Sequence, residues 1–419
     1  MRVFSSHQLL SMVTMRILNW ELEQLLRTAE MGPLLQTAVR SSGWELESWA
    51  LDRVYSHPNG DTSARFETTV SGSPVTLVAC TRDLSERERR RLGAVRCEAG
   101  VGALHIWAHP SDPELPGLSV VEDREALTDR LSAALRTEVS VQEAQMVVLR
   151  PLRRAVYRLS ATSGTGPRTV FIKVVRPHKV PELLARHRAC TLTPATVDLG
   201  EGMLLMEQAP GLALTELLHQ PSAPHPGVRV DPGAVLSALQ AVTPRALDLR
   251  PRTPPADRFD DALGSLVVAG ADPSRLETLT RNITAHLDRS AVKHVPTHGD
   301  FHPANLFMAP DGQRPTALID ADTVGPGRRR DDLATMLAHL LALPSFDAVG
   351  YCEVPRFAAD MWHHAADRGN EDLLGRTAAS LLSLAPGART LGQLDYYIGE
   401  AERILQTGAI TPAEPPLME

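Results

Sequence analysis

The sequence predicts an α+β fold in which a small α+β domain (residues 1–140) precedes a β-rich lobe (141–208), a helical lobe (209–410) and a short tail (411–419). Two observations support this prediction. Before residue 208, short apolar runs bounded by turn residues are typical of strands. Beyond it, apolar residues three and four positions apart indicate helices, among them 212–218 and 355–368, which Pro- and Gly-rich loops such as 221–226 separate.

The composition narrows the class of protein. The chain has 419 residues, 43% of them hydrophobic and 22% charged, which is typical of globular domains with sizeable cores. A net charge of −7 argues against a nucleic-acid or membrane-surface partner, because such partners call for a basic surface. The four cysteines lack CxxC spacing, which favours reduced thiols over zinc or disulfides. Without a signal-peptide pattern or an eighteen-residue apolar run, we expect a cytoplasmic protein.

The N-terminal domain is expected to combine helices with strands. A helical stripe at 16–40 breaks near Gly32-Pro33, and a charged helix or loop is expected at 85–93. The GxG pattern at 100–102 fits a hairpin turn better than a nucleotide-binding loop. Residues 109–118 are rich in turn-forming residues and are expected to form a linker. Strands are expected at 44–54, 64–70, 75–80 and 103–108, and a helix at 124–135.

The β-rich lobe is expected to contain strands at 145–149, 155–161 and 169–175. The third strand carries Lys173 among apolar residues. Because an unpaired buried ammonium is costly, this lysine either serves a ligand or snorkels at a sheet edge. A helical stretch, 179–190, follows and contains Glu182.

Four residues recur at a constant spacing of 93, and the recurrence suggests an internal repeat. In that register Cys80 stands where Lys173 stands. We hypothesise that residues 42–110 form an antiparallel sheet like that of the following lobe, but without its chemistry, and that it caps or extends that lobe. Chance recurrence is the alternative. The recurring pairs are Pro58 and Pro151, Arg65 and Arg158, Pro74 and Pro167, and Thr76 and Thr169.

The most informative stretch is HGDFHPANLFMAPDGQRPTALID, residues 298–320. Asp300 and Asn305 precede two short apolar strands joined by a turn, and the second strand ends at Asp320. Such a hairpin can bring the three side chains together. Phosphoryl transfer from a magnesium nucleotide needs a carboxylate to orient the attacking hydroxyl and hard oxygen ligands for the metal. A polar hairpin with incidental acids is the alternative.

HGDFHPAN, followed by LID and then by DDLA, resembles the catalytic segment of the aminoglycoside phosphotransferase and choline kinase-like family, which has a protein-kinase-like fold. The resemblance covers about residues 145–410 and implies a two-lobe kinase-like fold behind the extra N-terminal domain. The family usually has Gly where Ala304 stands. The implied roles are catalytic base for Asp300, magnesium ligands for Asn305 and Asp320, and braces of the catalytic loop for His298 and Asp332.

The resemblance also implies a nucleotide site. Lys173 would hold the ATP phosphates and pair with Glu182. The segment MLLMEQAPGLAL, 203–214, resembles the hinge, where backbone groups near Glu207 and Ala209 would meet the adenine edge.

The chain departs from the kinase pattern at its phosphate loop. No GxGxxG precedes Lys173, and the turn Arg150-Pro151-Leu152-Arg153-Arg154 stands in its place. Arginine binds phosphate oxygens bidentately, so Arg153 and Arg154 are candidates for that task. A solvated basic turn is equally compatible with the sequence.

The implied function is transfer of the ATP γ-phosphate, with Mg²⁺, to a hydroxyl of a small molecule such as an aminoglycoside or other antibiotic, a sugar or an amino alcohol. One alternative is a kinase acting on Ser/Thr of a peptide in a modified-peptide pathway. Another is a nucleotide-binding pseudokinase, against which the full set of Lys173, Asp300, Asn305 and Asp320 argues. Asp322 is a candidate for a second metal or for capping the following turn, and we favour the turn. Neither the acceptor nor the oligomeric state follows from the sequence.

Overall fold

The computed structural model describes residues 21–57, 60–100, 102–164, 166–220, 229–288, 290, 293–365 and 370–412. The chain divides into two compact units. The first comprises Met1–Val180 with Thr196–Glu207, and the second Pro181–Ala195 with Gln208–Glu419. One boundary therefore falls between Glu207 and Gln208, within the segment predicted as a hinge.

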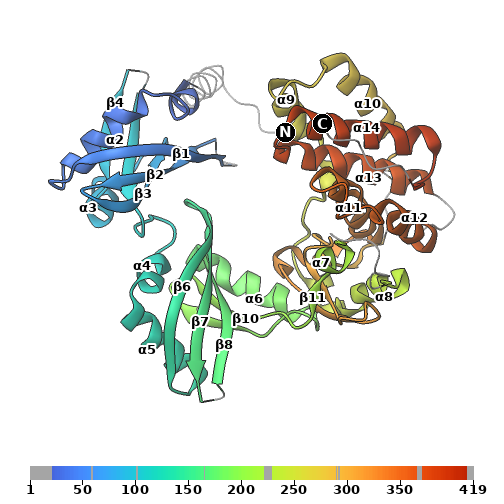
Figure 1. The fold of residues 1–419 in the computed structure, drawn as a ribbon, viewed down its shortest axis with the longest axis horizontal. Coiled ribbons are helices and arrows are strands. Elements are labelled where there is room, and N and C mark those ends of the chain that lie inside the picture. Colours follow the sequence, from blue (N-terminus) through green and yellow to red (C-terminus); the bar gives the residue numbers. More distant parts are fainter. Residues whose placement is uncertain are drawn as a thin grey trace. The chain divides into compact units, whose positions relative to one another are not determined.

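The first unit contains two antiparallel sheets of five strands each (Figure 1). Helix α2 (Met31–Arg40) packs on one face of the first sheet, and α3 (Glu86–Leu92) links β3 to β4. A reciprocal capping box between Ser85 and Glu88 starts α3, and Gly93 ends it in the left-handed conformation. The strands, in the spatial order β1-β2-β3-β5-β4, are β1 (Leu46–Ser56), β2 (Thr62–Val70), β3 (Ser73–Cys80), β5 (Gly102–Ala108) and β4 (Val95–Ala99).

The second sheet has the same strand order as the first. Helices α4 (Gly117–Glu122) and α5 (Arg124–Leu135) pack on one face and share its apolar core (Figure 1). The Asp123 side chain caps α5 by accepting hydrogen bonds from two backbone N–H groups. The strands, in the spatial order β6-β7-β8-β10-β9, are β6 (Val139–Arg150), β7 (Arg154–Ser163), β8 (Gly166–Val175), β10 (Met203–Glu207) and β9 (Thr196–Gly200).

The register of the strands reproduces the 93-residue spacing seen in the sequence. Ser63 pairs with Cys80 on β2 and β3, and Val156 pairs with Lys173 on β7 and β8. β1 and β6 each carry two register shifts, and α2 and α5 begin 93 residues apart. The antiparallel sheet expected over 42–110 is therefore confirmed, and we call 31–108 the first repeat and 124–207 the second repeat. Pro58, one of the recurring residues, lies outside the described part of the chain.

Several sequence predictions need correction. The break expected near Gly32-Pro33 is present, because a turn at 26–30 separates the helical residues 21–25 from α2. Gly32 and Pro33 themselves lie in the first turn of α2, where proline costs little because those N–H groups have no helical partner. Leu212–Ala213, predicted as helix, forms strand β11 on β13. Strand β9 and helices α4 and α9 (Asp260–Val268) were not predicted. The predicted loop 221–226, the end of the predicted helix 355–368 and most of the predicted tail lie outside the described residues.

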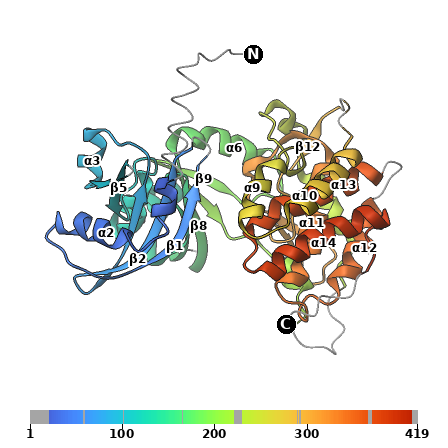
Figure 2. The same cartoon turned by 90° about the horizontal axis from the view of Figure 1, so that it is seen from above.

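The second unit is mainly helical and has one large apolar core. Helix α13 packs against α10, α11 and α14 (Figure 2). The unit also contains two small sheets. One consists of β11, β13 (Leu306–Met308) and β14 (Pro315–Leu318), and the other of β12 (Val295–Thr297) and β15 (Gly325–Gly327). Within the described ranges, no helix is long and apolar enough to cross a membrane. The remaining helices are α6 (Val180–Arg188), α7 (Leu214–Leu218), α8 (Pro232–Ser237), α10 (Pro273–His286), α11 (Arg329–Ala342), α12 (Val354–Ala365), α13 (Asn370–Leu384) and α14 (Leu391–Thr407).

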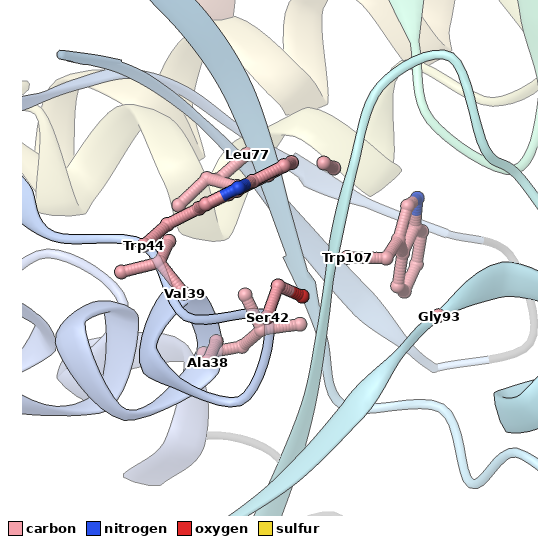
Figure 3. A pocket seen from close by; sticks show the side chains of 9 residues that line it. Ala38, Val39, Ser42, Trp44, Leu77, Gly93 and Trp107 are labelled. Carbon is pink, nitrogen blue, oxygen red and sulfur yellow. The ribbon is translucent and has the colours of Figure 1, made fainter. Parts of the chain in front are cut away.

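A small pocket lies in the first repeat. Figure 3 shows Trp44 and Leu77 on one side of it and Trp107 on the other. The residues predicted for the functional site are all described, and none of them lines this pocket. Its lining consists of Ala38, Val39, Ser42, Trp44, Leu77, Gly93, Ile106, Trp107 and Ala108.

Candidate active site

The hairpin of β13 and β14 brings the predicted catalytic residues to one end of the small sheet. Leu306 pairs with Leu318, and the Ile319 N–H donates to the Asn305 carbonyl at 2.9 Å, so Asn305 lies one residue from Asp320 across the hairpin. The Asn305 side-chain nitrogen Nδ2 donates to the carbonyl oxygen of Asp300 at 3.0 Å and to its carboxylate oxygen Oδ2 at 3.3 Å. Asp300 and Asn305 are therefore in direct contact.

Asp332 at the start of α11 fixes the loop that carries Asp300. Its two carboxylate oxygens accept hydrogen bonds from the His298 N–H at 2.9 Å and the Gly299 N–H at 2.7 Å. Burial raises the pKa of Asp332 to about 7, although these two bonds act in the opposite direction. Gly299 has φ of +79°, and a Cβ there would lie 2.8 Å from the Thr323 carbonyl oxygen. The loop conformation therefore requires glycine at this position.

His298 is fully buried beneath the same loop. Burial lowers the pKa of its imidazole to about 4, so the ring is neutral near pH 7. The Thr323 hydroxyl donates to its carbonyl oxygen at 2.9 Å. An imidazole with a lowered pKa is a weak base, and this one has no exposed surface, so these contacts suit a residue that supports the loop.

His302 was not singled out from the sequence. Its ring stacks on His339 of α11, with centroids 4.2 Å apart and planes 7° apart. Its Nε2 lies 3.8 Å from Oδ2 of Asp300. Burial lowers the pKa of His302, and the charges of Asp300 and Asp320 raise it in part, so both carboxylates act on this ring. His302 could have been found from the sequence because it lies between Asp300 and Asn305. No sequence pattern near His339 indicates that it contacts the site.

Helix α6 is tied to the segment that follows Asp320. Arg186 has no exposed side-chain surface and donates to the backbone carbonyls of Val324 and Arg250. His187 Nε2 lies 3.2 Å from the Asp322 carboxylate oxygen Oδ1. Asp322 therefore has a protein partner close to its carboxylate.

Glu182 lies on α6, as predicted, and accepts hydrogen bonds from two arginines. Its Oε1 accepts from Nη2 of Arg186 at 2.7 Å and from Nη2 of Arg252 at 2.9 Å. Lys173 belongs to the other unit. The ion pair expected between Glu182 and Lys173 therefore stays a prediction.

Lys173 lies on the central strand of the second sheet. It pairs with Val156 of β7 and with Leu204 of β10. The alternative of a lysine at a sheet edge is therefore wrong. Its neighbours Ile172 and Val174 belong to the core under α4 and α5, so alternation along the strand puts Lys173 on the opposite face.

The remaining predicted nucleotide residues lie at two ends of the same sheet or just beyond it. Glu207 ends β10 and forms an ion pair with Arg168 of β8. Ala209 follows it in the second unit and is half-buried. Arg153 lies in the turn between β6 and β7, and its N–H donates to the Arg150 carbonyl at 3.1 Å.

The donor set of the hairpin fits magnesium. Asp320 adopts the left-handed conformation, which aspartate tolerates, before a short 3₁₀ turn at Ala321–Thr323. The Asn305 amide nitrogen is directed at Asp300, so the oxygen Oδ1 is the side-chain atom suited to ligate a metal. Among the described residues, no cluster of three or more His, Cys, Asp or Glu is arranged to hold a metal. Magnesium commonly takes one or two protein ligands and completes its shell with phosphate and water oxygens.

Comparison with known proteins places this geometry in context. Residues 165–374, half of the chain, match the model of the phosphotransferase enzyme family, APH. No curated protein sequence matches the chain. One similar solved structure is a thermostable mutant of aminoglycoside phosphotransferase APH(4)-Ia in complex with AMP-PNP and hygromycin B. It is 15% identical to this chain and has a TM-score of 0.45, and the match covers 68% of this chain and 100% of that protein. Macrolide 2'-phosphotransferase type I is 16% identical, and the match covers 70% of this chain and 98% of that protein, with a TM-score of 0.41. Aminoglycoside phosphotransferase APH(3'')-Id from Streptomyces rimosus is 18% identical, and the match covers 62% of this chain and 98% of that protein, with a TM-score of 0.35.

Proposed function

This chain belongs to the phosphotransferase enzyme family, and on that basis we propose that it is a kinase that transfers the γ-phosphate of ATP to a hydroxyl of a small molecule. The family match confirms the kinase-like fold class predicted from the sequence. The observation that carries the proposal is the contact between Asn305 and Asp300 on a hairpin that ends at Asp320. The acceptor class we propose comprises aminoglycosides and other antibiotics, sugars and amino alcohols.

Each residue has a distinct task in this proposal. Asp300 accepts a hydrogen bond from the acceptor hydroxyl and orients it towards the phosphate, while Nδ2 of Asn305 holds the carboxylate in place. Asp320 and Oδ1 of Asn305 would hold Mg²⁺, which neutralises developing charge on the phosphates when bound. Lys173 would hold the ATP phosphates.

The residues around Asp300 keep it in position. Asp332 fixes the loop backbone, and the buried, neutral His298 fills the space beneath it. His302, stacked on His339, lies beside the Asp300 carboxylate. Preorganisation of this kind contributes to catalysis because little rearrangement is then needed during the reaction.

Replacing Asp300 with Asn tests the proposal. We expect turnover to fall by about 10³-fold while affinity for Mg²⁺·AMP-PNP changes little, because the amide keeps the size of the carboxylate but is a poor proton acceptor. ADP release would be measured with magnesium against aminoglycosides, macrolides, sugars, amino alcohols and Ser/Thr peptides. Asp311→Asn, in the turn of the same hairpin, is the matched control and should behave as wild type.

The acceptor panel also decides between the alternatives. Transfer to Ser/Thr peptides alone would make the protein a peptide kinase. Binding of AMP-PNP without transfer to any acceptor would favour a nucleotide-binding pseudokinase. Near-normal turnover by Asp300→Asn would refute the role assigned to Asp300.

A further inference from the structure

The turn that replaces a glycine-rich phosphate loop is anchored in the first repeat. Leu152, at its tip, is 2% exposed and packs in an apolar cluster whose other buried members all come from the first repeat. Its φ of +64° is a conformation that bulky residues rarely adopt and that persists only where the surroundings hold it. The other buried members are Val78, Cys80, Leu84, Leu92 and Trp107.

The backbone of Leu152 is held on both sides. Its N–H donates to Oδ2 of Asp112 at 2.8 Å, and its carbonyl accepts from Nε of Arg176 at 2.9 Å. Asp112 lies between the repeats, is 6% exposed and also accepts from the Glu114 N–H at 2.8 Å. The Glu114 carboxylate pairs with Arg176 at 3.3 Å and with Arg82 of the first repeat. Leu152 is therefore fixed by its side chain and by both backbone polar groups.

The end of β1 lies against the same turn. The Tyr55 hydroxyl donates to the Leu149 carbonyl at 3.0 Å, just before the turn begins. Burial lowers the pKa of His57, the charge of Asp61 raises it in part, and the charges of Arg176 and Arg153 lower it. His57 therefore lies within electrostatic range of an arginine proposed for phosphate binding. The first repeat thus meets the turn with β1 as well as with its apolar cluster.

The face of the first sheet that receives Leu152 is equivalent to the face of the second sheet that carries Lys173. In the second sheet, Ile172 points to the helix-covered core and Lys173 to the other face. In the first sheet, Ala79 points to the core under α2, while Cys80 lies in the cluster with Leu152. The first repeat therefore uses this face to hold the turn of its neighbour.

We propose that the first repeat is a brace for the phosphate turn Arg150–Arg154, with Leu152 and Asp112 as positioning residues that direct Arg153 and Arg154 to the ATP phosphates. The inference rests on the proposed function. Bidentate contacts from arginine are directional, so a turn that uses them must be fixed before the nucleotide arrives. Fixing it in advance lowers the ordering cost at binding.

The test compares Leu152→Ala with Leu104→Ala in the full chain. Both variants truncate a buried leucine, but Leu152 lies in the cluster that holds the turn and Leu104 in the core under α2 of the first repeat. Affinities for Mg²⁺·AMP-PNP and for adenosine, which lacks phosphate, would be measured by calorimetry. We expect Leu152→Ala to weaken AMP-PNP binding about fivefold to tenfold and adenosine binding less than about twofold, and Leu104→Ala to change neither beyond about twofold.

A second variant keeps the test usable if Leu152→Ala does not fold. Asp112→Asn removes one of two acceptor oxygens, and we expect a smaller but equally phosphate-specific loss. Equal effects of the two leucine variants, or parallel losses for adenosine and AMP-PNP, would overturn the brace. A wild-type chain that binds neither ligand would instead refute the proposed function, whereas normal AMP-PNP binding by every variant refutes only the brace.

Discussion

The two repeats share strand order and register, yet the same position carries Lys173 in one and Cys80 in the other. The Cys80 sulfur accepts a hydrogen bond from the Arg82 N–H at 3.2 Å, and burial raises the pKa of its thiol to about 12. A thiol in this state is neutral and unreactive. The topology thus directs one residue to this face of the sheet in each repeat. In the first repeat this residue packs against protein, and in the second we propose that it serves the nucleotide.

Replacing the two equivalent residues separately should give the largest contrast. Lys173→Met keeps the length of the side chain but removes its charge, and we expect turnover with ATP to fall at least about 100-fold. Cys80→Ala removes one buried sulfur atom, and we expect turnover within about twofold of wild type. The measurement is kcat/KM for ATP, with melting temperatures to show that both variants fold. Similar losses in the two variants would contradict the division of roles between the repeats.

The contact between the repeats should also depend on pH. Burial raises the pKa of Asp112 from 3.8 to about 6, with a smaller contribution from the charge of Glu114, while hydrogen bonds from backbone N–H groups oppose the rise. Between about pH 4 and 6 the folded chain therefore holds a proton that the unfolded chain has released. The contribution of Asp112 to the free energy of unfolding is therefore greatest at low pH. It falls by about 3 kcal/mol in total as the pH rises through about 6.

Asp112→Asn isolates this effect because asparagine does not titrate. The free energy of unfolding, from urea titrations at pH 4 and pH 7, should show wild type losing about 2 kcal/mol relative to the variant between the two values, because part of the loss occurs below pH 4. Asp332 and His298 titrate in both proteins, so their contributions cancel in the difference. A constant difference across this range would mean that Asp112 is not buried between the repeats.

The proximity of Asp300, Asn305 and Asp320 could be predicted from the sequence because their geometry is local. Asp300 and Asn305 are separated by five positions, and the strands that follow pair through a short turn, so chain connectivity alone brings them near Asp320. The strands around Lys173 were recognisable for the same reason. Whether these residues perform the chemistry proposed for them is for the Asp300 and Lys173 variants to decide.

The contacts that hold the site were not predictable, because they join residues far apart in sequence. Arg186 binds the Val324 carbonyl, His339 stacks on His302, and Asp112 holds Leu152. Each of these side chains would also be compatible with a solvent-exposed position, and only packing decides otherwise. The segment containing Asp112 looked like a linker because proline and acidic residues are typical of turns.

The smallest expected effect concerns the turns themselves. Arg153 and Arg154 stand where the first repeat has Gly60 and Asp61. If Arg153 holds a phosphate of ATP, Arg153→Ala should raise KM for ATP about fivefold and leave kcat within about twofold, because the contact would be kept in both ground and transition states. Arg158→Ala, an exposed arginine on β7, removes the same charge away from the turn and should change neither constant. Equal changes in both variants would indicate a general electrostatic effect and favour the alternative of a solvated basic turn. The first repeat would then still hold Leu152, but the turn would make no contact with phosphate.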